Sequence, residues 1–565
     1  MPVSALRFEP RVDIQARNLA EGQADITLRG GIFENTGIQV GAVSIADPQT
    51  GHYLAELPIA PAFLTAPSVR TSTELALGAA NATVAAIHHG WRPIQNAGAA
   101  TIGFGEFDLR RADIYQGVVT GAGSNGQRFG VDVALARSKS DGAIAYGEHE
   151  FNRANVRLQY KALHSQTDVF AGYQAKRFGW PNLYTPFNSN ETENLQTTLF
   201  TVNHRAEFRP GEFVELGAFH RRNKDDYAFN RFVPLGPVHP FQHTTWITGA
   251  AAGGRRDFGS FALNFRAEAS ADELESTSLT AGRYRTRTLT KVAVVPEKTW
   301  TNNDGSRFIV KAGAAHEDSN RDDGSVSPVA EIAREFQSSG LRRIAFSYTK
   351  TSQVPTYTAL NSSATAGLFR GNANLGRGKA HAFELGASGM VGGWITEAAV
   401  FWRRDDGLVD WTFRQGVTAR TANAVDVNVG GFEIVARRSW SAIDLVLGYT
   451  GLTKDADYRG ALVDASFYAL NYARNRVTAA ATVRLGEGVE LRVDNVLRSQ
   501  AANMLRVAGG DDAILTSIGL AYRPARFRAV EFSVQVDNLW NSDFQDVPAV
   551  PAMPRQWSAG VSYVW

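Results

Sequence analysis

The chain ends with the stretch Trp557-Ser-Ala-Gly-Val-Ser-Tyr-Val-Trp565, in which two kinds of residue alternate without interruption. One face carries Trp557, Ala559, Val561, Tyr563 and Trp565, and the other carries Ser558, Gly560, Ser562 and Val564. A period of two residues predicts a β-strand. An apolar face with an aromatic residue at each end is typical of a strand that faces lipid on one side and a polar lumen on the other. A strand of a soluble sandwich also alternates, so this stretch alone does not decide between the two.

The same alternation recurs along the chain, and its second face consists mostly of Gly, Ala and Ser with occasional charges. In a soluble protein the polar face would be rich in Lys and Glu instead. A crowded polar lumen therefore fits better, and the repeats favour a membrane barrel. The residues expected to face lipid are Ile344, Phe346, Tyr348, Phe383, Leu385, Ala387, Ile443, Leu445, Leu447, Tyr449, Ile518, Leu520, Tyr522, Val530, Phe532, Val534 and Val536.

The amino-acid composition excludes several classes of function. The 58 Lys and Arg residues nearly balance the 56 Asp and Glu residues, so the net charge of +2 gives no support to nucleic-acid binding. The absence of cysteine excludes thiol catalysis and thiolate metal sites. The sequence contains no apolar run of about 18 residues, so no membrane-spanning helix is expected. Barrel strands need only about 9–11 residues, half of them polar, and they remain compatible with this composition.

Turn signals divide the chain after residue 96 into strands joined by short and long connections in alternation, which is typical of outer-membrane barrels. Counting back from the C-terminus gives an all-β membrane protein with about 22 antiparallel transmembrane strands in residues 97–565. Short turns are expected at 124–127, 209–212, 257–259, 302–305, 337–340, 391–393, 485–488 and 523–526. Long outer connections are expected near 139–141, 180–194, 224–243, 316–327, 353–379, 403–426, 454–467, 501–512 and 541–555.

Residues 1–96 lack this hairpin pattern and contain short apolar runs broken by Gly, Asp and Pro. The segment is too long for a linker and too apolar for a disordered tail. A barrel of about 22 strands is too wide for its own side chains to fill. We therefore expect a small α/β plug domain in the lumen.

Three segments, in order along the chain, together resemble TonB-dependent outer-membrane receptors. Residues 25–31, 38–44 and 47–52 are similar to the plug of that family, and residues 353–357, 371–376 and 382–386 are similar to a loop and strand of its barrel. Val536-Asp-Asn-Leu-Trp-Asn541, Pro554-Arg-Gln-Trp557 and Trp565 resemble the C-terminal signature. Two departures are Gly41-Ala42, where the family usually has Asp-Gly, and residues 69–78, a plug-to-barrel junction without the usual Gly-Pro pair.

The resemblance implies a monomer in the bacterial outer membrane, surrounded by lipid. Its implied activity is energised uptake of a scarce nutrient such as a ferric siderophore, cobalamin or a similar chelate. The energy would come from the TonB complex pulling on the plug. The chain is expected to begin inside the plug, without the leader, the TonB box or the first plug strand. The alternatives are a passive or uncoupled channel or structural barrel and, disfavoured by the apolar outer face, a soluble secreted all-β protein.

Candidate ligand-binding residues come from plug turns expected to point outward and from aromatic residues of the outer connections. For the plug residues, packing against the barrel wall is the alternative; for the outer aromatics, it is a place in the lipid-interface girdle. Arg29 and Gly30 are expected either to pair with lumen carboxylates or to signal occupancy across the plug. The candidates are Phe33, Glu34, Asn35, His52, Tyr53, Trp180, Tyr184, Tyr227, Tyr357 and Trp411.

No motif for catalysis stands out in the sequence, which shows no paired carboxylates, nucleophile elbow, phosphate loop or zinc spacing. His88 and His89 are adjacent on an expected strand, so their side chains face opposite ways and do not form a metal site. We therefore expect no enzymatic activity, no metal site and no cofactor.

Overall fold

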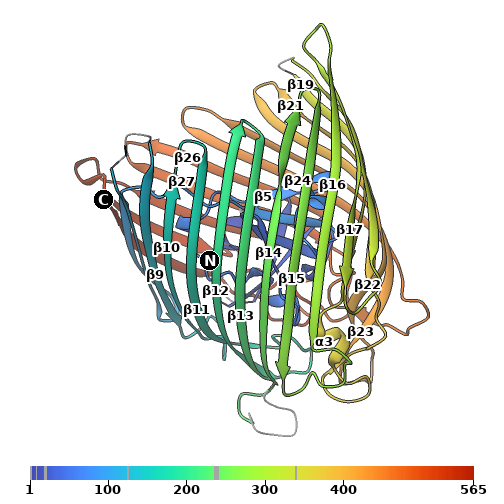
Figure 1. The fold of residues 1–565 in the computed structure, drawn as a ribbon. Coiled ribbons are helices and arrows are strands. Elements are labelled where there is room, and N and C mark those ends of the chain that lie inside the picture. Colours follow the sequence, from blue (N-terminus) through green and yellow to red (C-terminus); the bar gives the residue numbers. More distant parts are fainter. Residues whose placement is uncertain are drawn as a thin grey trace.

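The computed structural model describes residues 3–7, 9–17, 22–121, 123, 126–233, 241–337 and 340–565. Parts of three expected connections, residues 124–125, 234–240 and 338–339, lie outside the described residues. The described chain forms one closed antiparallel barrel with the N-terminal segment inside it (Figure 1). No helix in the described residues is long and apolar enough to cross a membrane.

The barrel has 22 long strands in the described residues, which confirms the predicted number, and it closes where β30 pairs with β7. Two strands of two residues each, β20 (Phe369–Arg370) and β25 (Ala465–Ser466), extend the outer rim. The outer connection between β19 and β21 also carries helix α3 (Tyr357–Asn361). The long strands are β7 (Ala97–Gly105), β8 (Leu109–Val119), β9 (Arg128–Ser140), β10 (His149–Lys161), β11 (Ser165–Pro181), β12 (Asn190–Arg209), β13 (Glu212–Ala228), β14 (Phe241–Phe258), β15 (Phe261–Ser276), β16 (Thr286–Thr301), β17 (Arg307–Ser319), β18 (Ser325–Glu335), β19 (Leu341–Gln353), β21 (Gly378–Val391), β22 (Trp394–Phe413), β23 (Arg420–Ser439), β24 (Ile443–Asp457), β26 (Ala473–Gly486), β27 (Val489–Gln500), β28 (Asp512–Tyr522), β29 (Val530–Asp537) and β30 (Gln556–Val564).

Side chains alternate across the barrel wall as the period of two predicts. The expected lipid-facing residues Phe346, Leu385 and Phe532 are 50, 49 and 47% exposed, although each is large and apolar. The terminal strand pairs Val561 with Ile102 of β7 and with Phe532 of β29, so its apolar face continues around the closure. An apolar outer wall of this kind is what a bilayer requires.

Strands β22 and β23 correct one prediction. Residues 403–426 were expected to be a long outer connection, but β22 continues to Phe413 and β23 begins at Arg420. Their ladder shifts register between Asp405 and Leu408, and Gly407 there has a φ of 69°. The bulge interrupts the ladder only locally, and pairing resumes at Leu408 and continues to Thr412. Trp411 therefore projects from a strand, not from a loop.

The N-terminal segment forms a small mixed domain in the lumen. A two-stranded sheet pairs β1 (Val12–Arg17) with β2 (Gln23–Leu28), and a four-stranded sheet has the order β4-β3-β6-β5. The strands of the second sheet are β3 (Thr36–Val40), β4 (Val43–Ile45), β5 (Ser68–Arg70) and β6 (Ala85–His89). The helices are α1 (Val3–Leu6), α2 (Ser72–Ala76) and the 3₁₀ turns η1 (Phe33–Asn35), η2 (His52–Ala55) and η3 (Pro61–Phe63); η4 (Ala525–Phe527) lies in the β28–β29 connection of the barrel.

Residues 69–78, which the sequence suggested as the plug-to-barrel junction, lie within this N-terminal domain. They contribute to β5 and α2, and the first barrel strand, β7, begins only at Ala97. The expected junction is wrong because β5 pairs with β6, which follows it in the chain and holds it in the inner sheet.

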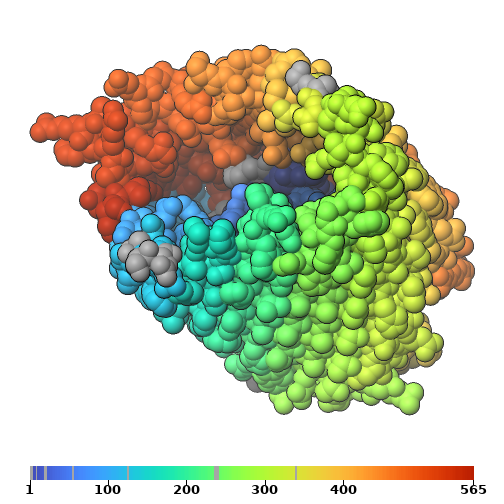
Figure 2. Space-filling view, turned by 45° about the horizontal axis from the view of Figure 1, so that its top comes forward, coloured from blue at the N-terminus to red at the C-terminus, as the bar shows by residue number. Residues whose placement is uncertain are grey.

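An oblique view toward the end with the short turns shows a hollow in the barrel, with atoms of the N-terminal domain inside it (Figure 2). Its contacts with the wall are highly polar, more so than the small residues of the quoted strands suggested. Buried ion pairs join Lys176 to Glu56, and Arg498 to Asp13 with an Nη2–Oδ2 distance of 2.8 Å. At Gly41 (φ 57°) an added Cβ would lie 2.2 Å from Asn203 Oδ1, so the β3–β4 turn requires glycine there.

Candidate functional site

A cavity of about 250 Å³ lies between the N-terminal domain and the outer connections of the barrel. The N-terminal domain, which we call the plug for its position in the lumen, contributes the turn around η2, which begins after Gly51 in the left-handed region (φ 79°). The other sides of the cavity come from β12, β13, β14, β22 and the α3 connection. The lining residues are Gln49, Thr50, His52, Tyr53, Tyr184, Glu193, Asp225, Tyr227, Phe241, His243, Ser278, Leu279, Thr358, Ser362, Ser363, Ala366, Gly367, Leu368, Phe369, Trp411 and Arg420.

Aromatic rings form a continuous series along this cavity, which we call the aromatic run. It starts in the plug, where Phe33 stacks on His52 with a centroid distance of 4.0 Å. It continues through ring pairs with centroids 5.2 to 6.2 Å apart, which is the range of favourable aromatic contacts. Its members are Phe33, His52, Tyr184, Tyr227, Phe241, Phe369 and Trp411.

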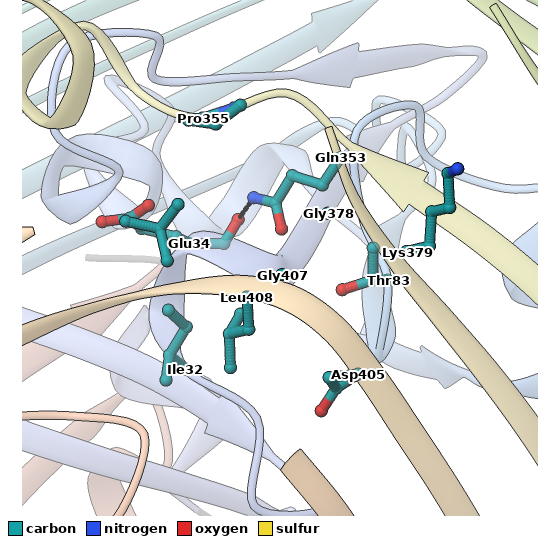
Figure 3. A pocket seen from close by; sticks show the side chains of 11 residues that line it. Ile32, Glu34, Thr83, Gln353, Pro355, Gly378, Lys379, Asp405, Gly407 and Leu408 are labelled. Carbon is teal, nitrogen blue, oxygen red and sulfur yellow. Dashed lines mark hydrogen bonds between the residues drawn. The ribbon is translucent and has the colours of Figure 1, made fainter. Parts of the chain in front are cut away.

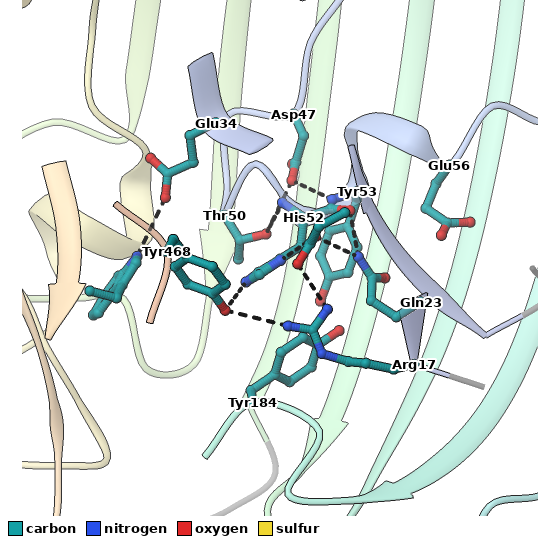
Figure 4. Close-up of polar contacts among 12 residues, drawn as sticks. Arg17, Gln23, Glu34, Asp47, Thr50, His52, Tyr53, Glu56, Tyr184 and Tyr468 are labelled. Atoms are coloured by element: carbon teal, nitrogen blue, oxygen red, sulfur yellow. Dashed lines mark hydrogen bonds and ion pairs between the residues drawn. The ribbon is translucent and has the colours of Figure 1, made fainter. Parts of the chain in front are cut away.

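A buried charge network holds the plug side of the cavity in place (Figure 4). Asp25 accepts from Arg17 Nη1 at 2.8 Å and lies 2.8 Å from His52 Nδ1. Burial alone would raise the pKa of Asp25, but His52 and Arg17 outweigh it and hold that pKa well below the usual range. Burial lowers the pKa of His52 in spite of the opposing effect of Asp25. The network orients the His52 ring for stacking.

The opposite side of the cavity is acidic. Glu193 of β12 accepts from the Tyr53 hydroxyl at 3.2 Å, and Asp225 of β13 accepts from Gln49 Nε2 at 2.5 Å. Burial, and then the negative charges of Asp225 and Glu193, raise the pKa of Tyr53 well above its usual value. The phenol therefore stays a donor throughout the physiological range.

One cation faces the cavity from β23. The Arg420 guanidinium lies over the Phe467 ring at 4.0 Å and over the Tyr468 ring at 5.0 Å, and it also donates to the backbone oxygen of Tyr184. Its Nε is buried without a hydrogen-bond partner among the described residues. These ring contacts help to keep the guanidinium in place next to the cavity.

Glu34 lies at a second, much smaller cavity of about 20 Å³ beneath the α3 connection (Figure 3). Gln353 of β19 donates to the Glu34 backbone oxygen, and Trp411 Nε1 lies 3.4 Å from the Glu34 carboxylate. Burial raises the pKa of Glu34 to about 8. A plug carboxyl group is thus held neutral next to the aromatic run.

The structure brings some of the predicted ligand residues together and separates others. His52, Tyr53, Tyr184, Tyr227 and Trp411 line the cavity, and Phe33 stacks directly behind His52. Glu34 lines the smaller cavity.

Besides Phe33 and Glu34, three further predicted residues do not line the large cavity. The Asn35 amide oxygen accepts from Ile32 N at 2.9 Å and closes the η1 turn. Trp180 is fully buried and donates to the Pro551 oxygen at 3.0 Å. Tyr357 is fully buried and donates to Asp272 at 2.6 Å. Their contacts hold neighbouring loops together.

Arg29 and Gly30 lie at the wall of the barrel, away from the cavity. The Arg29 guanidinium contacts Glu384 and Glu433 with N–O distances of 2.5 Å each. Burial alone would lower the pKa of Arg29, but the two carboxylates raise it. Gly30 has a φ of 65°, and an added Cβ would lie 2.9 Å from the Lys454 side chain.

The ligand-binding residues predicted from the sequence do not include Phe241, Arg420 and Tyr468. Phe241 begins β14 immediately after a connection, and Arg420 begins β23. Their position in the sequence could have identified them. A large or charged residue at the outer end of a barrel strand, on the face toward the lumen, points toward the mouth of the barrel.

A family model described as "TonB dependent receptor-like, beta-barrel" matches residues 93–539. The chain belongs to the TonB-dependent receptor family. As a member of this family with a closed barrel, it is a multi-pass protein of the bacterial outer membrane. No curated protein matches the sequence significantly.

Solved structures share the fold of this receptor at low sequence identity. The FrpB iron transporter from Neisseria meningitidis (F3-3 variant) matches with a TM-score of 0.77 and 13% identity, over 100% of this chain and 96% of that one. The copper transporter OprC matches with a TM-score of 0.75 and 14% identity, over 100% and 98%. The siderophore receptor PirA from Acinetobacter baumannii matches with a TM-score of 0.71 and 12% identity, over 98% and 94%.

Proposed function

We propose that this TonB-dependent receptor binds a scarce nutrient, such as a ferric siderophore, cobalamin or a similar chelate, in the cavity lined by the aromatic run. TonB would then drive uptake by pulling on the plug. The observation that carries the proposal is the composition of this cavity, which combines plug residues with residues of the outer strands and connections. A ligand bound there would contact both the barrel and the part that must move.

The filled lumen supports energised uptake over passive flow. Buried ion pairs fasten the plug to three different strands of the wall, β23, β11 and β27, and they are Arg29–Glu433, Lys176–Glu56 and Arg498–Asp13. A wide barrel without such a domain would leave an aqueous channel. Work on the plug is therefore needed to open a path, and the alternative of an uncoupled channel gains no support from these contacts.

The aromatic side chains of the cavity indicate the chemical class of its ligand. Six aromatic side chains line the cavity, namely Tyr53, Tyr184, Tyr227, Phe241, Phe369 and Trp411. Such surfaces favour a rigid organic ligand that has flat apolar parts and a few polar groups. The iron, copper and siderophore transporters with the same fold make a metal chelate the first class to test.

The test is a binding screen of ferric siderophores, cobalamin and other chelates against the full chain refolded in detergent, monitored by tryptophan fluorescence. A ligand of this cavity should lose about tenfold or more in affinity when Trp411→Ala or Tyr227→Ala removes a ring. The matched control is Phe232→Ala, because Phe232 is an outer-loop aromatic residue that is 61% exposed and does not line the cavity. Binding that all three variants leave unchanged would place the ligand elsewhere.

A further inference from the structure

The acidic side of the cavity contains polar atoms with no partner. Glu193 is fully buried and Asp225 is 2% exposed. Glu193 Oε1 and Asp225 Oδ1 have no hydrogen-bond partner among the described residues, and neither does Oε1 of the adjoining Gln49. A buried acceptor left without a partner is costly, so these oxygens are sites where a donor from a ligand would be stabilised.

The strand register places these groups side by side on the lumen face. Leu195 of β12 pairs with Asp225 of β13, so Glu193, two residues away on β12, is the diagonal neighbour of Asp225. Asp225 in turn pairs with His243 of β14. No arginine or lysine of the described chain forms an ion pair with either carboxylate, although other lumen carboxylates, such as Glu56 and Asp272, have one.

The surroundings suit a cation. Tyr53, Tyr184 and Tyr227 line the same cavity, and the faces of such rings attract positive charge. The two free carboxylate oxygens and the free amide oxygen are all acceptors, which an ammonium group with several N–H donors would satisfy together.

We propose that Glu193 and Asp225 form a subsite for a positively charged group of the ligand, such as a protonated amine, with the tyrosine rings around it. The proposal rests on the proposed function in that it takes this cavity to be the ligand site. It deepens that function by requiring a cargo that carries a cationic group, for which Gln49 supplies a third acceptor from the plug.

The experiment uses three probes of similar size that share one ring and differ in charge: benzylammonium, benzyl alcohol and benzoate. Each is titrated by calorimetry into the refolded full chain at pH 7. Benzylammonium should bind most tightly, and the double variant Glu193→Gln/Asp225→Asn should lower its affinity by about tenfold or more, with little effect on benzyl alcohol. Asp226→Asn is the control, because the adjacent residue faces the other side of the strand and its substitution also removes a carboxyl group next to Asp225.

Several results would overturn the proposal. These are binding of benzoate or benzyl alcohol as tight as that of benzylammonium, failure of all three probes to bind, and benzylammonium binding that the double variant leaves unchanged. The charge series on the unmodified protein does not depend on any variant refolding.

Failure of this inference and failure of the proposed function can be told apart. A chelate that binds at Trp411 and Tyr227 but is indifferent to the double variant would remove the cationic subsite and leave the receptor function standing. Binding of benzylammonium without binding of any chelate would support the cationic subsite and would contradict the proposed chelate receptor function.

Discussion

Arg29 of the plug and Glu433 of β23 form an ion pair with an Nη2–Oε1 distance of 2.5 Å, although they are far apart in sequence. Glu384 of β21 contacts the other terminal nitrogen of the same guanidinium, also at 2.5 Å. The Arg29 side chain is only 9% exposed, so this three-residue contact is screened little by water. It is a point at which the plug is fastened to the wall.

Replacing Arg29 by alanine should loosen the plug, because two buried carboxylates would lose their counter-charge. Breaking a buried pair in this way costs about 3–5 kcal/mol. The measurement is the urea concentration at which the plug becomes sensitive to protease in detergent. The control is Arg137→Ala, because Arg137 pairs with Glu150 on the exposed surface and such pairs contribute about 1 kcal/mol at most. Equal midpoints for the two variants would contradict a fastening role for Arg29.

Deleting residues 1–96 should leave a folded barrel that conducts ions. The strand hydrogen bonds close through β30 and β7 without any help from the plug. The same deletion should abolish ligand binding in the cavity, because it removes Gln49, His52 and Tyr53. Planar-bilayer conductance and ligand titration measure the two effects. A deletion variant that conducts no better than the full chain would show that this segment does not obstruct the lumen.

Arginine should be tolerated differently on the two faces of β30. Val561→Arg places a charge against lipid next to Ile102 and Phe532 and should impair assembly, at a cost of about 2–4 kcal/mol at the bilayer midplane. Ser562→Arg faces the lumen beside Thr101 and should have a milder effect. The yield of heat-modifiable folded barrel measures both. Similar yields for the two variants would reverse our assignment of inside and outside.

Glu34 should make the stability of the docked plug depend on pH. Burial raises the pKa of Glu34 from its ordinary value of 4.5 to about 8, so the docked plug binds a proton that the unfolded chain releases at lower pH. Its contribution to stability is fully present below pH 4.5 and is lost as pH rises toward 8. Glu34→Gln should flatten this slope in urea titrations of plug docking, by a few kcal/mol at most. A slope that persists unchanged in the variant would assign the dependence to other groups.

Some of the predicted residues line the cavity because aromatic residues near turns are visible in the sequence, whereas the direction of their side chains is not. Trp411 and Trp180 were indistinguishable as aromatic residues of outer connections. The structure directs Trp411 into the cavity and buries Trp180 against Pro551. Tyr357 likewise turns away to Asp272, while Phe369, twelve residues on, joins the aromatic run. Loop conformation decides these directions, and loops have no short-range period to reveal it.

The sequence by itself determined that this protein is a membrane barrel of about 22 strands, because side chains on a strand alternate between its faces at every residue. The terminal stretch from Trp557 to Trp565 already contains that information. Only the tertiary structure decided the cavity. Phe33, Tyr227 and Trp411 join one aromatic run because closure of the barrel and docking of the plug bring distant segments together. Local pattern is a property of the strand, whereas the cavity is a property of the closed barrel and its plug.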